Sequence, residues 1–272
     1  MKKALLICDG SHFPTGAFMM AKNLHSLSPM LLTGVFLSST QFTNLWFYPT
    51  GVSADFVTTM IAQDDEVVTK NIGLFTSLCK NYGIECSVHQ HTGDLILDSV
   101  KKESRFADLI VMSSELFYAN IEAHQPNSYT KTILHEAECP VLLVPEEAEQ
   151  LTGLVLTYDG SDASVFAIKQ FAYLFLELCN LDATLVFANN QVKEMPDKEY
   201  IEDFARRHFS KLSFVTLDIS PKEYFATWAE HNKNSLLVSG SFGRSSISNA
   251  FKKSFITETI EDHEMPVFVS HK

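Results

Sequence analysis

Short runs of apolar residues alternate along the chain with longer stretches in which apolar and polar residues recur at helical spacing. An apolar run of about four to eight residues between turn signals is typical of a buried strand. In the first half these runs predict strands at 3–8, 31–37, 84–90, 108–113 and 140–144. The stretches between them predict helices from Pro14 onward and at 55–82, 94–106 and 128–136.

The second half has the same alternation. Its apolar runs predict strands at 153–158, 183–188, 212–217, 235–239 and 266–269. The intervening stretches predict helices at 162–178, 197–209, 221–231 and 253–262. Strands that alternate with helices indicate right-handed βαβ units, and so an α/β fold with a parallel sheet and helices on both of its faces.

Three blocks of the first half recur in the second half in the same order. Residues 5–11, LLICDGS, recur as VLTYDGS at 155–161, and DLIVMS at 108–113 recurs as SLLVSG at 235–240. The block CPVLLVP at 139–145 recurs as MPVFV at 265–269. A repeat of this length indicates two copies of one fold. We therefore expect domains at 1–147 and 152–272, joined by the acidic segment at 146–150.

With these blocks the chain resembles a tandem universal stress protein. The family pattern opens with a strand that ends in Asp-Gly-Ser, continues with a strand of the DLIVM type and a glycine-containing loop, and closes with a CPVLVV strand. The matching segments here are Asp9–Ser11, Asp108–Met112, Gly240–Arg244 and Ser254. The resemblance implies two Rossmann-like doubly wound domains, each with a five-stranded parallel sheet in the order 3-2-1-4-5. It also implies a cytoplasmic protein of the stress response.

The loop after residues 235–239 has the composition of a phosphate site. Glycine lets the backbone approach an anion closely, and the free N–H groups of a helix N-terminus bind negative charge. The alternative is an ordinary strand-to-helix loop with surface lysines, because a lone glycine-rich loop is a weak signal. In the family these positions hold a nucleotide, usually ATP, with the aspartate near the adenine and ribose. The resemblance therefore implies a nucleotide site of Asp159, Gly240, Ser241, Gly243, Arg244, Lys253 and Ser254.

Lys253 is the position where this chain departs from the family pattern. That pattern has a glycine there, separated by nine residues from the position of Gly243 and standing directly before Ser254. If the position needs a positive φ, lysine costs about 1 kcal/mol or more; alternatively, its ammonium group reaches the phosphates. The sequence leaves both open.

The first half departs further from the pattern. Ser113 and Leu116 stand where the glycines should be, and Asn127 precedes Ser128. Residues 113–130 contain no lysine or arginine, whereas Glu115 and Glu122 add negative charge. A triphosphate would meet side chains and like charge there, so we expect a degenerate site.

Two other groups of residues have the residue types of a metal site or of a catalytic site. His89 and His91 alternate on one strand with Asp94 nearby, but histidines at the end of a strand are more often solvated than metal ligands. Asp9, Ser11 and His12 have the residue types of a catalytic triad, but adjacent residues in a turn rarely reach its geometry. The sequence therefore predicts no metal site and no catalytic residue.

Composition excludes several classes of protein. The formal net charge is −12 and both halves are acidic, which argues against a broad nucleic-acid-binding face. The apolar runs are of strand length, so no membrane span is expected, and the N-terminus reaches Asp9 too soon for a signal peptide. Five scattered cysteines without a C-x-x-C pair fit a cytosolic protein, with Cys8 and Cys139 expected as inert core thiols.

Together these features predict a stress-response protein that binds ATP, with or without Mg²⁺, in its second half, and whose role is regulatory. Two alternatives stay open: a slow ATPase, and a protein-interaction module that uses the aromatic segment Phe42–Tyr48. The last strand of each half is apolar and would be an edge strand, which proteins usually cover or pair. We therefore expect the strands at 141–144 and 267–269 to join the halves as a pseudo-dimer, with a homodimer left open.

Overall fold

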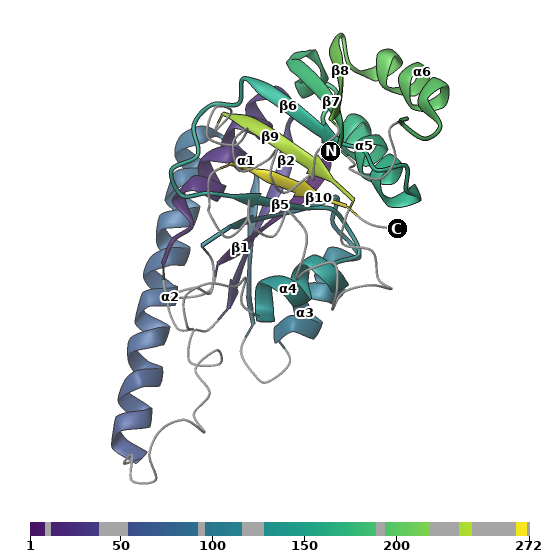
Figure 1. The fold of residues 1–272 in the computed structure, drawn as a ribbon. Helices are drawn as coiled ribbons and strands as arrows, with labels where there is room; N and C mark the ends of the chain where they lie inside the picture. The colour runs from purple at the N-terminus through teal and green to yellow at the C-terminus, as the bar shows by residue number, and fades with distance from the viewer. Residues whose placement is uncertain are drawn as a thin grey trace. The chain divides into compact units, whose positions relative to one another are not determined.

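The computed structural model describes residues 1–8, 12–37, 54–91, 96–115, 128–188, 194–217, 234–240 and 265–270. It divides the chain into two compact units, Met1–Cys139 and Pro140–Lys272. Strands and helices alternate in both units, as Figure 1 shows. The α/β class predicted from the alternation is therefore confirmed.

The first unit contributes four parallel strands in the order β3-β2-β1-β4. Ala4 of β1 lies opposite Leu32 of β2 on one side and Leu109 of β4 on the other. The strands are β1 (Lys2–Cys8), β2 (Met30–Leu37), β3 (Cys86–His91) and β4 (Leu109–Ser113). The helices are α1 (Thr15–Leu27), α2 (Ala54–Tyr82), α3 (Ile96–Ser104) and α4 (Ser128–Glu136).

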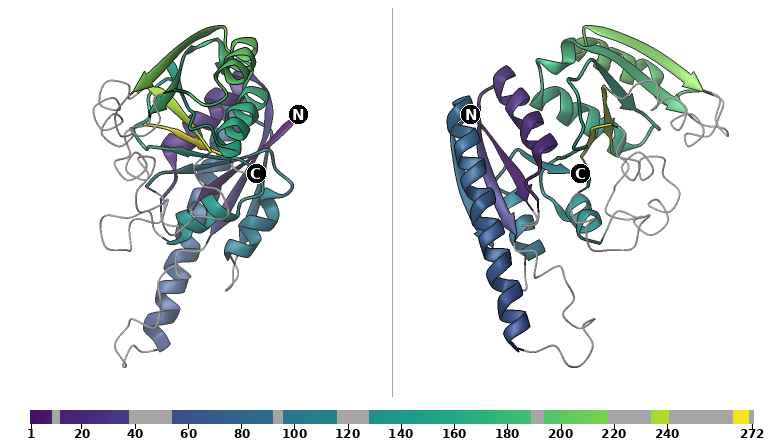
Figure 2. Two further views of the ribbon diagram at one scale, coloured as in Figure 1. Left: turned by 45° about the vertical axis from the view of Figure 1, so that its right-hand side comes forward. Right: turned by 90° about the vertical axis from the view of Figure 1, so that its left-hand side faces the viewer.

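Aromatic side chains hold α1 and α2 together on one face of these strands. The Phe18 ring of α1 meets the Phe75 ring of α2 edge to face, with 6.3 Å between centroids. Phe75 also meets Phe36 of β2 at 5.8 Å, and all three rings are fully buried. Figure 1 and the right-hand view of Figure 2 both show α1 and α2 side by side. Helices α3 and α4 lie on the other side of the strands of this unit. This arrangement follows from right-handed crossovers that reverse direction after β3.

Helix α2 ends in a tight turn that leads directly into β3. Gly83 has a φ of 66°, and the N–H of Ile84 donates to the carbonyl of Cys79 at 2.9 Å. The N–H of Gly83 donates to the carbonyl of Lys80 at 3.3 Å. This is a Schellman motif, in which a glycine adopts the left-handed conformation and satisfies the last helical carbonyls.

The second unit contributes six strands in the order β5-β10-β9-β6-β7-β8. All neighbours are parallel except β10 and β5, which pair antiparallel with Phe268 opposite Leu142. The strands are β5 (Val141–Val144), β6 (Gly153–Thr157), β7 (Asp182–Ala188), β8 (Lys211–Leu217), β9 (Ser235–Ser239) and β10 (Val267–Val269). The helices are α5 (Asp162–Leu174), the 3-10 turn η4 (Leu178–Asn180) and α6 (Lys198–His208).

Phe171 of α5 lies at the centre of the second unit's core. Its ring meets Phe268 of β10 edge to face at 5.3 Å and stacks on Phe209 at 6.5 Å. Phe175, just beyond the helix, also contacts Phe171 and Phe268. Helix α5 ends at Leu174, four residues before the predicted end, because Phe175 turns inward to join this cluster.

The prediction of two separate five-stranded sheets is wrong in its number of sheets. The ten strands belong to one sheet, and β5 lies in the second unit, where it is bonded to β10. Backbone pairing of β5 satisfies groups that an open edge would leave unpaired. Cys139 precedes β5 and is half-buried, so it is not the fully buried core thiol that the sequence predicted. The predicted helices at 221–231 and 253–262 and the aromatic segment Phe42–Tyr48 lie outside the described residues.

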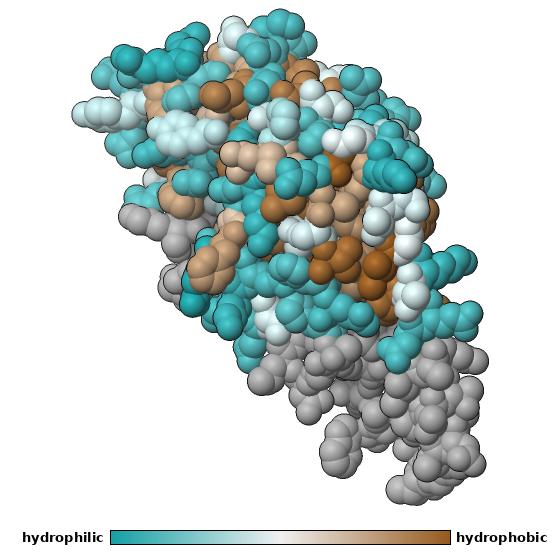
Figure 3. Space-filling model, turned by 180° about the vertical axis from the view of Figure 1, so that it is seen from behind, coloured by the Kyte–Doolittle hydropathy of each residue, from teal (hydrophilic) through white to brown (hydrophobic). Residues whose placement is uncertain are grey.

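The surface is mixed in polarity. On the face drawn in Figure 3, hydrophobic side chains show between more numerous hydrophilic ones. In the part of the chain that the structure describes, no helix is both long and apolar enough to cross a membrane.

Candidate functional site

The strand order of the second unit reverses between β6 and β9, and this is where an open α/β sheet binds ligands. The two strands run parallel, with Leu156 opposite Val238, so their carboxyl ends meet at one edge of the sheet. The hydroxyl of Thr157 donates to the carbonyl of Val238 at 2.9 Å and ties these ends together. A candidate site can therefore be built from the residues that follow the two strands.

Asp159 begins the turn that follows β6. Its side chain is exposed, and its Oδ1 accepts a 2.9 Å hydrogen bond from the N–H of Ser161. Gly160 between them has a φ of 84°, which favours glycine. Ser161 is the N-cap of α5, and its hydroxyl accepts from the N–H of Ser164 at 3.2 Å. The sequence Asp-Gly-Ser thus has a structural use of its own, as an Asx turn followed by a helix cap.

Gly240 follows β9 and is buried against the first turn of α5. A Cβ atom at this position would overlap the carbonyl of Ala163 and lie 2.7 Å from the backbone nitrogen of Ser164. Glycine is therefore required here for close packing, whether or not a ligand binds. The Asp159 turn and Gly240 both border the first turn of α5, so the structure brings these two predicted residues to one place.

Tyr158 belongs to the same edge, and the sequence analysis did not single it out. The buried phenol donates a 2.8 Å hydrogen bond to the carbonyl of Pro196. A Cβ at Gly160 would lie 2.9 Å from the ring of the same proline, so the segment before α6 packs on the Asp159 turn. Burial raises the pKa of Tyr158, and the charges of Asp197 and Asp159 add to this effect. The signal was present in the repeat, where this tyrosine replaces Cys8.

The other predicted ligands lie outside the described residues. These are Ser241, Gly243, Arg244, Lys253 and Ser254. Of the predicted ligands, the structure therefore describes Asp159 and Gly240.

The corresponding edge of the first unit carries a carboxylate. Ser113 and Ser114 follow one another at the end of β4 and are both buried. Their hydroxyls donate to Oε2 of Glu115 at 2.8 and 3.0 Å, and the N–H of Glu115 donates to the Ser113 hydroxyl at 3.2 Å. These bonds hold a negative charge where the family pattern places a phosphate loop. The remaining residues of this edge, Asp9–Ser11, Leu116, Glu122 and Asn127, lie outside the described part of the chain.

His89 and His91 of β3 both bond to one carboxylate. Nδ1 of His89 lies 2.8 Å from one oxygen of Glu103, and Nε2 of His91 lies 2.5 Å from the other. Glu103 belongs to α3, whereas Asp94, the partner considered from the sequence, lies outside the described residues. Within the described ranges, no group of three histidine, cysteine or acidic side chains forms a metal site.

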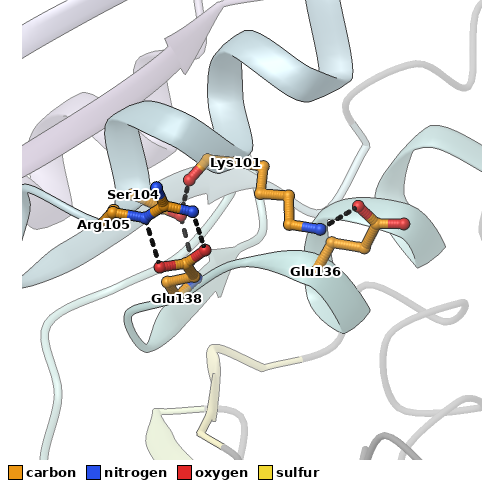
Figure 4. A network of polar contacts seen from close by, with 5 residues as sticks. All are labelled: Lys101, Ser104, Arg105, Glu136 and Glu138. Carbon is orange, nitrogen blue, oxygen red and sulfur yellow. Dashed lines mark hydrogen bonds and ion pairs between the residues drawn. The ribbon is translucent and has the colours of Figure 1, made fainter.

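A separate polar network joins α3 to the segment that follows α4 in the first unit (Figure 4). The Arg105 guanidinium binds both carboxylate oxygens of Glu138, at 2.8 and 2.6 Å. The Ser104 hydroxyl accepts from the N–H of Glu138 at 2.9 Å, and Lys101 pairs with Glu136 at 3.1 Å. Because these charges bind one another, the network is a structural tie and not a ligand site.

Comparison with solved structures relates the whole chain to universal stress proteins. A universal stress protein from Archaeoglobus fulgidus DSM 4304 superposes with a TM-score of 0.69 at 14% sequence identity, over 100% of this chain and 96% of that one. A functionally unknown protein from Pseudomonas aeruginosa PAO1 superposes with a TM-score of 0.50 at 12% identity, over 100% of this chain and 92% of that one. No protein-family model matches the sequence, and no curated protein matches it. The fold of the chain is therefore that of the universal stress proteins.

Proposed function

We propose that the chain binds an adenine nucleotide, ATP with or without Mg²⁺, in its second half, as a regulatory protein of the stress response. One observation carries the proposal. The Asp159 turn, which caps α5, and Gly240 after β9 border the same helical turn at the edge where the strand order reverses. That edge is the ligand-binding position of a doubly wound sheet.

Asp159 has the capacity to bind a ribose as well as to shape its turn. A carboxylate offers about four acceptor sites, and the N–H of Ser161 takes one of them. The exposed remainder of the carboxylate accepts hydrogen bonds from ribose hydroxyls in this proposal. The phosphates then contact the backbone at Gly240 and the groups of Ser241, Gly243, Arg244, Lys253 and Ser254.

The first half does not bind nucleotide in this proposal. The Glu115 carboxylate, held by Ser113 and Ser114, would repel a phosphate at the corresponding edge. The chain is then a tandem of two universal stress protein domains, 1–147 and 152–272, of which the second is equipped for the ligand. The proposal includes a pseudo-dimer of the two repeats. We place the protein in the cytoplasm and assign it no catalytic residue.

The test begins with the purified full chain. Denaturation followed by analysis of the released small molecules identifies any nucleotide that copurifies, and calorimetry with ATP measures the affinity. Phosphate release separates a slow ATPase from a binder. If neither a released nucleotide nor ATP binding is found, the proposal is wrong, and the aromatic segment Phe42–Tyr48 becomes the next surface to test as a protein-interaction module.

A matched pair of variants locates the site. Asp159→Asn keeps an oxygen that can accept from the N–H of Ser161, so the turn survives while the charge is lost. Asp182→Asn makes the same change at the start of β7, at the opposite edge of the sheet. We expect about tenfold weaker ATP binding for Asp159→Asn only, the effect of one charge-assisted hydrogen bond. Equal affinities of the two variants would remove Asp159 from the site.

A further inference from the structure

The segment 194–197, which precedes α6, packs on the turn that follows β6. The phenol of Tyr158 donates to the carbonyl of Pro196 at 2.8 Å, and the N–H of Tyr158 donates to the carbonyl of Val186 in β7 at 3.0 Å. A Cβ at Gly160 would lie 2.9 Å from the Cβ and Cγ atoms of Pro196. The segment is therefore held to the end of β6 by a side-chain hydrogen bond and by close packing on a glycine.

Asp197, the last residue of this segment, has a backbone conformation that needs support. Its φ is 48°, in the left-handed region, and among the described residues no other non-glycine residue has a positive φ. Its carbonyl accepts from the N–H groups of Tyr200 and Ile201 at 3.0 and 3.1 Å, but its side chain makes no capping bond to α6. A non-glycine residue keeps such a conformation only where its surroundings hold it there. The bond from Tyr158 to Pro196, directly before Asp197, is a restraint of this kind.

The order of the strands places this segment on one side of the Asp159 turn. Strand β6 lies between β9 and β7 and runs parallel to both. Gly240 after β9 and the segment 194–197 after β7 therefore flank the Asp159 turn from opposite sides. If the phosphates lie toward Gly240 and the ribose lies at Asp159, the remaining side, toward the segment 194–197, is left for the base.

We propose that Tyr158 is a positioning residue of the nucleotide site: by holding Pro196, it fixes the segment 194–197 as the side of the site that contacts the base and ribose. This inference rests on the proposed binding of a nucleotide in the second half. Tyr158 is only 3% exposed, so it acts through Pro196 and not by touching the ligand. Loss of its hydroxyl should therefore free the segment and weaken nucleotide binding without changing any residue that contacts the ligand.

The variant Tyr158→Phe removes the hydroxyl and keeps the ring, which packs on Phe187 with 6.5 Å between centroids. The matched control is Tyr173→Phe, which removes a hydroxyl from a ring of α5 that is 52% exposed. Calorimetry of the purified full chain measures the affinity for ATP. We expect about three- to tenfold weaker binding for Tyr158→Phe only, the effect of one lost neutral hydrogen bond.

Hydrogen exchange of the chain without nucleotide gives a second readout. The N–H groups of Tyr200 and Ile201, which bond to the Asp197 carbonyl, should exchange faster in Tyr158→Phe than in wild type. The N–H of Phe209, which bonds to the carbonyl of Ala205 at the other end of α6, should keep its wild-type rate. A general loss of stability would instead raise the exchange rate at both ends of the helix.

A second substitution tests whether Tyr158 acts through the backbone of Asp197. Glycine adopts the left-handed conformation without a restraint. In the background of Asp197→Gly, Tyr158→Phe should therefore weaken ATP binding by less than about twofold. An equal loss in both backgrounds would overturn the inference.

The remaining outcomes separate this inference from the proposed function. If wild type and Tyr158→Phe bind ATP equally well, or if exchange at Tyr200 and Ile201 is unchanged, Tyr158 is not a positioning residue and nucleotide binding still stands. If the wild-type chain binds no ATP, both the inference and the proposed function are wrong.

Discussion

Gly240 packs so closely against Ala163 that the backbone of α5 occupies the place of a side chain. Gly240→Ala should therefore lower the free energy of unfolding by about 2–3 kcal/mol, because an added methyl group forces strand β9 and helix α5 apart. Urea unfolding measures the change. Gly73→Ala is the control: this glycine lies in α2 with nothing within 4 Å of an added Cβ, and the same substitution should stabilise by about 0.5–1 kcal/mol.

Tyr158 should make the free energy of unfolding decrease at alkaline pH. The folded protein keeps the neutral phenol to a higher pH than the unfolded chain, whose tyrosines titrate near pH 10. Its contribution is full below about pH 10 and is lost as the pH rises through the raised folded pKa. Urea unfolding from pH 8 to 11 should show a shallower loss for Tyr158→Phe than for wild type. Tyr173→Phe, at a side chain that is 52% exposed, should follow the wild-type curve.

Arg105 connects two elements through both of its hydrogen bonds to Glu138. Lysine keeps the charge but lacks the planar fork, so Arg105→Lys should lower the unfolding temperature. Arg207 makes similar bonds to Asp203, but within the single helix α6. Arg207→Lys should therefore change the unfolding temperature less, and equal shifts in a thermal melt would contradict a special role for the tie between α3 and α4.

The assignment of nucleotide binding to the second half predicts an asymmetric pair of variants. Gly243→Leu, which copies Leu116, should abolish ATP binding because its side chain enters the phosphate loop. Leu116→Gly should create no binding, because Glu115 still places a carboxylate at the first unit's edge. Calorimetry decides, and an unchanged affinity of Gly243→Leu would refute the assignment.

Two substitutions of Lys253 distinguish the two explanations for its departure from the family pattern. If its ammonium contacts phosphate, Lys253→Ala should weaken ATP binding by about 1–3 kcal/mol. If lysine is instead strained there, Lys253→Gly should strengthen binding by restoring the family backbone. No change in either variant would make Lys253 a solvated residue at the start of the helix predicted at 253–262.

Local pattern was enough to find the described elements. The apolar run at 235–239 matches β9, and the long helix predicted at 55–82 matches α2 within one residue. Pairing between strands distant in sequence carries no local signal, so the expectation that the strands at 141–144 and 267–269 join came from their apolar edge position and not from periodicity, and the antiparallel direction of the β5–β10 pair was not predicted. The end of α5 was missed for a related reason, since Phe175 leaves the helix to reach Phe268 of another strand.

The sequence predicted which candidate residues follow directly after strands. It did not predict contacts in which one of the two side chains belongs to a helix. Asp159 and Gly240 lie at the same edge of the sheet because the parallel strands β6 and β9 end there. His89 and His91 instead meet Glu103, which the packing of α3 on β3 supplies and which their sequence neighbours do not suggest. The close approach of Gly240 to Ala163 could not be predicted either, because the sequence does not distinguish a glycine needed for packing from a glycine needed for ligand binding.

The bonds from Ser113 and Ser114 to Glu115 bear on how the chain would respond to ligand concentration. An anion that arrives at this edge must displace a carboxylate that already has its donors. If the proposed site in the second half binds nucleotide, saturation would involve one molecule for each chain, and the response would follow a simple hyperbola without a threshold. If the chain is a tandem of two such domains, as we propose, it would report ligand in proportion to its abundance, and the half without ligand would be free to diverge toward other partners.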